Sequence, residues 1–124
     1  MHGFKEENIN VLMDDDEHES PTKDNMIAAY KKIVSECEAG DALFLHYSGH
    51  GAKIRDDDDG EEEDGFDECL VPLDYQNKGM IRDDDLYEII VKGMPDGVHV
   101  VCLVRIFLLD LTSTYVSTCC YNEY

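Results

Sequence analysis

The segment LFLHYSGHGAK, residues 43–53, contains the histidine with the clearest chemical potential in this chain of 124 residues. His50 lies between two glycines, directly after a run of apolar and aromatic residues. An imidazole titrates near neutral pH, so this residue suits general acid–base chemistry. The glycines allow close approach of a substrate, and the N–H of Gly51 can donate a hydrogen bond to a developing oxyanion. The alternative is a tight turn in which His50 points into solvent.

A second histidine, His46, lies four residues before His50. On a helix this spacing places two imidazoles on one face, where they can share a zinc ion. The apolar residues around His46 predict a strand instead, so a shared metal ion is not expected. We interpret His46 as a core histidine with a hydrogen-bonded partner.

The elements that must position these residues follow from the apolar pattern. Two helices are predicted, one starting near Thr22 or Asp24 and one capped at Asp83, because short polar side chains accept the first free amide groups of a helix. Apolar runs predict three strands, at residues 9–13, 42–47 and 98–104.

The order strand, helix, strand, helix, strand predicts an α/β fold with a mostly parallel sheet flanked by helices. The third strand is apolar throughout, which is typical of a strand covered on both faces. Sites in such sheets form at the carboxyl ends of the strands. Three segments are therefore expected to meet there: residues 14–16, residues 48–51 and the residues after Val104.

The charge of the chain restricts its partners. It carries 29 acidic and 10 basic residues, with a formal net charge of −19. Such a chain repels nucleic acid and anionic membrane surfaces, whereas cations and basic peptides are suitable partners. Residues 56–68 contain acids and no base, and residues 56–63 are interpreted as a solvated acidic loop.

The cysteines indicate a reducing compartment. Their number is odd, no C-x-x-C pair occurs, and the first residues lack the apolar core of a secretory signal. We therefore expect a cytoplasmic protein. The longest apolar run, residues 98–111, is interrupted by Arg105 and is too short to cross a bilayer. The cysteines are Cys37, Cys69, Cys102, Cys119 and Cys120.

Four segments together resemble one known family. They read INVLMDDD with PTKDNM, GDALFLHYSGHG, DGFDECLVPLDY and GMIRDDDLYEIIVKGMPDGVHVVCLV. The chain is similar in these segments to the metacaspases, which are caspase-like cysteine endopeptidases that cleave after Arg or Lys. The resemblance runs from about Gly3 to Leu103. It implies a partial caspase-like domain over residues 1–104 and a divergent tail over residues 105–124.

The resemblance implies roles for three residues of the histidine segment. His50 matches the family's general base and acid, which acts beside a cysteine nucleophile because only the thiolate attacks. Gly51 matches the backbone donor to the oxyanion. Ser48 matches a residue that lines the pocket for the basic side chain of the substrate.

The resemblance also implies calcium. Asp67, Asp83 and Asp84 match acids that hold an activating calcium ion, and calcium prefers several hard oxygen ligands. Without the resemblance, Asp83 is explained as a helix cap and Asp67 as part of the solvated acidic loop. The acidic run also lacks the D-x-[DN]-x-[DN]-G pattern of a calcium loop.

The family pattern breaks after the third strand. A spacing of about 50 residues between histidine and cysteine, as in the related caspases, predicts a nucleophile near position 105. The acid-x-Cys-His-Ser-Gly element of the family is absent there. Arg105 stands where the family has an acid, and Phe107 stands near the expected position of the nucleophile. No other cysteine is a convincing replacement; Cys102, inside the apolar strand, is expected to be a buried, inert thiol with a raised pKa.

Three hypotheses follow. The first is a metacaspase-family endopeptidase, lacking the first strand and the smaller subunit of the family and inactive as written, either as a true pseudoenzyme or because a gene-model error altered the residues after Leu103. The second is a non-catalytic interaction module that binds a full-length relative, or a basic peptide through its acidic face. The third is a calcium-binding acidic protein. A sheet without its edge partners is also an aggregation hazard, chiefly at residues 98–111.

Overall fold

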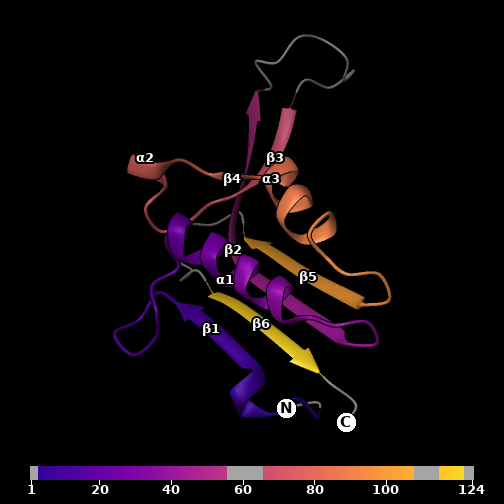
Figure 1. Ribbon diagram of the computed structural model, residues 1–124. Helices are drawn as coiled ribbons and strands as arrows, with labels where there is room; N and C mark the ends of the chain where they lie inside the picture. The colour runs from indigo at the N-terminus through magenta and orange to yellow at the C-terminus, as the bar shows by residue number, and fades with distance from the viewer. Residues whose placement is uncertain (1–2, 56–65, 108–114, 122–124) are drawn as a thin grey trace.

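The computed structural model describes the backbone of residues 3–55, 66–107 and 115–121, and the side chains of residues 3–54 and 68–106. One sheet dominates the structure, with α1 lying across one of its faces (Figure 1). The strands are β1 (Ile9–Met13), β2 (Ala42–Arg55), β3 (Phe66–Leu70), β4 (Ile81–Arg82), β5 (His99–Phe107) and β6 (Tyr115–Tyr121). The helical elements are η1 (Glu6–Asn8), α1 (Lys23–Glu36), α2 (Tyr75–Lys78), α3 (Asp83–Leu86) and η2 (Tyr87–Val91).

The predicted α/β fold is confirmed, with a mixed sheet. The strand order is β1-β6-β2-β3-β4, and β5 pairs with β2. The β2–β5 pair is parallel, as expected for strands joined by a helical crossover. β1 runs in the same direction as β2, but the two do not pair, because β6 lies between them and is antiparallel to both.

Both predicted helices are present. Thr22 caps α1, since its hydroxyl oxygen accepts the N–H of Asn25 at 3.3 Å. The second helix is shorter and more irregular than a single apolar stripe predicts: α3 gives way to the π-helical turn η2. Its N-cap is Arg82, one residue before the predicted Asp83.

The core lies between α1 and one face of β2. Burial alternates along β2, and Leu43, Leu45 and Tyr47 are buried while their neighbours are half-exposed. The inner face of α1 packs in the same cluster through Met26 and Ile33, among other residues. The opposite face of β2 therefore carries its even-numbered residues, including both histidines and Ser48.

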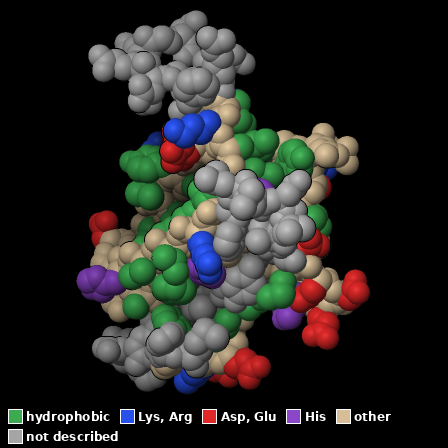
Figure 2. Space-filling model, turned by 180° about the vertical axis from the view of Figure 1, so that it is seen from behind, with side chains coloured by type: hydrophobic (Ala, Val, Ile, Leu, Met, Phe, Trp, Pro, Cys, Tyr) green, Lys and Arg blue, Asp and Glu red, His purple; other side chains and the backbone are tan. Residues whose placement is uncertain are grey.

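The prediction that the third strand is covered on both faces is wrong for the part of the chain that the structure describes. β5 pairs only with β2 there, and its apolar side chains remain accessible. Figure 2, seen from behind, shows hydrophobic side chains at the surface of the molecule on this side. The exposed apolar residues of β5 are Val100, Val101, Leu103, Val104 and Ile106.

The helices of the described residues can be compared with the length and apolarity needed to span a membrane. The longest helix, α1, has 14 residues, and none of the helices there combines the length and apolarity that a bilayer crossing requires.

The exposed face of β5 generates a prediction about association. Val101→Lys should slow aggregation of the full chain, because a charge on an open apolar edge opposes strand-to-strand pairing. Val91→Lys, on η2, is the matched control: the two valines are 59% and 57% exposed, and each change adds the same charge. Light scattering against protein concentration measures the effect. Equal scattering by the two variants would show that β5 does not drive association.

Candidate functional site

His50 marks the position where β2 changes partners. Before it, residues Ala42–His50 pair with β5, and after it Gly51–Arg55 pair with β3. The strand predicted over residues 42–47 is therefore longer than expected: residues 48–51, which were expected to form a loop after its end, are part of one continuous strand of 14 residues. The physical reason is β3, whose backbone supplies partners that extend β2 beyond the end of β5.

The backbone of His50 is fixed by a buried tyrosine. The Tyr47 hydroxyl donates a hydrogen bond to the His50 carbonyl at 2.6 Å. The N–H of Val71 donates to the same carbonyl at 3.2 Å, and it also lies 3.3 Å from the Tyr47 oxygen. Tyr47 is 2% exposed, and burial raises the pKa of its phenol, although the Val71 backbone opposes this shift. The hydroxyl thus stays protonated and remains a donor.

The His50 side chain is half-buried and borders a cavity of about 400 Å³. Among the described residues, the others that line it are Val71, Tyr75 and Met80, which are mainly apolar. An imidazole at the rim of such a cavity is accessible to a small group while its backbone is held. This arrangement suits a residue that exchanges protons with a bound molecule.

Gly51 lies close to the side chain of Ile106 in β5. A Cβ atom built there would lie 2.7 Å from Cδ1 of Ile106, well inside van der Waals contact. Both residues line a second cavity of about 380 Å³, together with buried Cys69. A larger residue at position 51 would therefore require the Ile106 side chain to shift.

The strand register brings the expected site residues together. Ser48 pairs with Arg105 and His50 pairs with Phe107 across the β2–β5 ladder. The position where a nucleophile was expected therefore lies directly beside the histidine, about 4.8 Å away at strand spacing. The residue there is phenylalanine, which has no nucleophilic group.

The described cysteines do not meet His50 in a reactive arrangement. Cys102 pairs with Leu45, five residues before Phe107, so about 16 Å of strand separates it from the position beside His50. The prediction that Cys102 is buried is wrong: its side chain is exposed, because β5 is uncovered, although partial desolvation raises its thiol pKa. Cys37 and Cys69 are buried, and the side chains of Cys119 and Cys120 lie outside the described residues.

Residues 14–16 follow β1 at the same end of the sheet, as predicted. Met13 and Ser48 are both level with Tyr115 of β6, so the segment begins two strands away from the histidine segment. Its Asp15 forms a local turn: the carboxylate accepts the N–H of His18 and contacts the imidazole at 2.8 Å, and these bonds lower the Asp15 pKa. These contacts explain Asp15 as a turn residue.

The three aspartates expected to hold calcium are only partly described. Asp83 and Asp84 begin α3, are exposed, and interact with each other, since the Asp84 N–H donates to Asp83 Oδ1 at 2.9 Å. Asp67 lies in β3, which contacts α3, but its side chain is outside the described part. Among the side chains that are described, no three His, Cys, Asp or Glu residues gather as a metal site.

Sequence reasoning missed the role of Tyr47 and interpreted His46 differently. His46 is half-buried on the face away from α1, rather than in the core, because even-numbered residues of β2 point that way. The alternation within LFLHYSGH could have predicted the role of Tyr47. It places this tyrosine on the buried face of the strand, where its hydroxyl needs a hydrogen-bond partner.

Comparison with known proteins places this geometry in context. The family model described as "Metacaspase, peptidase C14 domain" matches residues 1–106. Metacaspase III c of Phaeodactylum tricornutum is 67% identical over 104 residues, covering 84% of this chain and 31% of that protein. Metacaspase-1 of Schizosaccharomyces pombe is 42% identical over 120 residues, covering 92% of this chain and 28% of that protein. The chain therefore spans less than a third of the length of these relatives.

A solved structure is similar as well. The crystal structure of protein GSU0716 from Geobacter sulfurreducens aligns with a TM-score of 0.55 and 33% sequence identity. The alignment covers 66% of this chain and 29% of that one. The sheet and its helices thus have a counterpart in an experimentally determined fold.

The hydroxyl of Tyr47 can be tested directly. Tyr47→Phe should lower the free energy of unfolding by about 0.5–1.5 kcal/mol, because it removes a buried hydrogen bond to the His50 carbonyl. It should also speed hydrogen exchange at the Val71 amide. Tyr75→Phe is the control, since the Tyr75 hydroxyl bonds only the neighbouring exposed Gln76 among the described contacts. Equal effects of the two changes in denaturant titration would refute the role of Tyr47.

Proposed function

Because this chain belongs to the metacaspase family of C14 peptidases, we propose that its histidine segment is the base half of a cysteine-peptidase site. The proposal rests on the register of the β2–β5 pair, which places His50 beside position 107. The Tyr47 hydroxyl holds the backbone carbonyl of His50, and His50 borders an open cavity. In the proposed reaction class, peptide bonds are hydrolysed after Arg or Lys.

The proposed roles follow from the chemistry of acyl transfer. A thiolate attacks the scissile carbonyl, and an imidazole first accepts the thiol proton and later protonates the leaving amine. His50 is assigned the imidazole role. The Gly51 N–H is assigned to the oxyanion and Ser48 to the pocket for the basic side chain. The net charge of −19 favours a basic substrate and opposes nucleic acid, and the odd number of cysteines and the lack of a C-x-x-C pair favour a cytoplasmic setting.

We further propose that the chain as written does not catalyse this reaction. Phe107 occupies the position beside His50, and the exposed thiol of Cys102 is about 16 Å along the strand. Without a nucleophile, the covalent route is lost, and positioning by the remaining residues does not replace it.

The first experiment is a peptidase assay. The full chain should release no product from Arg- or Lys-containing peptides, with or without calcium, and should match the His50→Ala variant within error. Turnover that His50→Ala and a thiol alkylator both abolish would overturn the proposal of inactivity.

A gain-of-function variant tests the histidine half separately. Phe107→Cys introduces a thiol at the position in register with His50, and a neighbouring imidazolium lowers a thiol pKa. Its alkylation by iodoacetamide should therefore begin at lower pH than that of Cys102, whose own pKa is raised. The double variant Phe107→Cys with His50→Ala is the control and should lose this early phase. Identical pH profiles for the single and double variants would contradict the role of His50.

A second candidate function is a non-catalytic interaction module. The open edge and the exposed apolar side chains of β5 favour association with a full-length member of the family. Binding through the acidic surface to a basic peptide is the other form of this proposal. Capture of a purified full-length metacaspase that weakens with salt supports the acidic surface, and salt-insensitive capture that Val101→Lys abolishes supports β5. Absence of capture in both cases counts against the module.

Calcium binding is proposed on the donor chemistry of three carboxylates. Asp67 in β3 and Asp83 and Asp84 at the start of α3 supply hard oxygen ligands from two elements in contact. A bound calcium ion would neutralise these carboxylates and link β3 to α3.

Calorimetry tests this site. Calcium binding should be lost when Asp67→Ala and Asp83→Ala are combined. The matched control combines Asp24→Ala and Asp96→Ala, which are exposed aspartates elsewhere and change the net charge equally. Equal loss in both double variants would indicate general charge attraction, and unaltered binding in the first would refute the site.

A further inference from the structure

β6 lies inside the sheet although it comes from the tail that follows the family match. The match ends at residue 106, and β6 spans Tyr115–Tyr121. On one side β6 pairs antiparallel with β1, from Ile9 opposite Cys119 to Met13 opposite Tyr115. On the other side it pairs antiparallel with the first half of β2. A segment beyond the residues that the family model matches thus completes the ladder between two strands within them.

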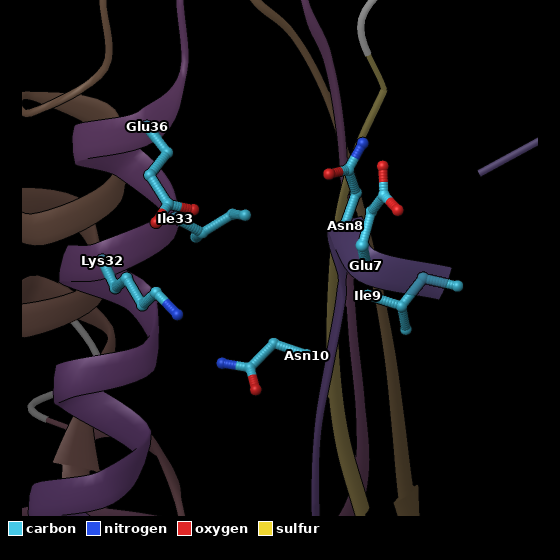
Figure 3. A pocket seen from close by; sticks show the side chains of 7 residues that line it. All are labelled: Glu7, Asn8, Ile9, Asn10, Lys32, Ile33 and Glu36. Carbon is cyan, nitrogen blue, oxygen red and sulfur yellow. The ribbon is translucent and has the colours of Figure 1, made fainter. Parts of the chain in front are cut away.

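β1 depends on this pairing. Among the described residues β6 is the only strand that forms a ladder with β1. α1 gives less support at the start of β1, because a cavity of about 160 Å³ separates the two elements there. Figure 3 shows Asn10 of β1 and Lys32 of α1 pointing into this space from opposite sides. Without β6, the inner edge of β1 would expose its amide and carbonyl groups.

We propose that the gap between β1 and β2 is a strand-acceptor site. It takes an extended, uncharged segment antiparallel to both neighbours, and residues 115–121 are its occupant in this chain. The site binds chiefly through backbone amides and carbonyls, as in recognition by strand addition, here with two edges instead of one.

Charge supports this choice of partner. The occupant reads YVSTCCY and carries no charged residue, although the chain as a whole has a net charge of −19. The bordering segments INVLM and ALFLHYS also contain no acid or lysine or arginine. An acidic strand would be repelled by the net negative charge of the chain, and its carboxylates would lose hydration between the two neighbouring strands. The acceptor site therefore selects against acidic segments.

The topology makes the occupant separable from the rest of the sheet. β5 and β6 pair with opposite edges of β2. The elements β1, α1, β2 and β5 all precede β6 in the chain, so the segments that join them to one another do not include β6. A strand of matching chemistry supplied in trans, including residues 115–121 of a second copy, can therefore make the same backbone bonds.

Hydrogen exchange of the full chain tests the site. Ser117 pairs with both Val11 and His46, and Ser117→Pro removes an amide that a central strand requires. Protection of β1 should fall at least tenfold in this variant, while the β3–β4 pair keeps its protection. Ser117→Ala is the control, because it retains the backbone N–H. Unchanged protection of β1 in Ser117→Pro would overturn the proposal.

A peptide supplies the occupant in trans. Residues 115–121, with serine at both cysteine positions, should restore the protection of β1 in the Ser117→Pro chain, and a scrambled peptide should not. Failure of the matched peptide to restore protection in a chain whose β3–β4 pair remains protected overturns the proposal.

If Ser117→Pro also abolishes the protection of β3 and β4, hydrogen exchange of the unmodified chain is the deciding measurement. Joint exchange of β1 and β6 in one correlated step supports the acceptor site. Exchange of β6 while β1 stays protected overturns it.

Discussion

The ladder of hydrogen bonds along β2 is the constraint on which the rest of the structure depends. This strand pairs with β5 and β6 over its first half and with β3 over its second half. β3, β5 and β6 therefore pair directly with β2. β1 is attached to the sheet through β6, and β4 is attached through β3. Unpaired backbone groups inside a sheet are costly, so the positions of the other strands follow from this one strand.

The alternation of β2 separates stability from chemistry. Leu43, Leu45 and Tyr47 point toward α1 and form the core, whereas His46, Ser48 and His50 lie on the other face. Tyr47 connects the two functions, because its ring is in the core and its hydroxyl holds the His50 carbonyl. A change in the core packing of this ring would thus move the backbone of the proposed base.

Local patterns predicted both main helices and three of the strands, whereas β3, β4, β6 and the long-range pairing were not predicted. The apolar runs located β1, β2 and β5, and the spacing of Met26, Ile33 and similar residues located α1. The length of β2 and the central place of β6 depend on partners far away in sequence, β3 and β1, which no local pattern reveals. Exposure of β5 was missed for the same reason: an apolar strand fits a covered position, but its sequence does not say whether a neighbour is present.

The site shows the same division in chemical terms. The residue types around His50 predicted a base, and the β2–β5 register adds where its partner has to stand. Parallel pairing with His50 at the end of the ladder leaves one adjacent position on β5, and Phe107 occupies it. The hydrogen bond from the Tyr47 hydroxyl to the His50 carbonyl and the close approach of Gly51 to Ile106 are made by residues other than 107. The geometry that supports a base can therefore persist in a chain without a nucleophile, because packing and backbone bonds maintain it and catalysis does not.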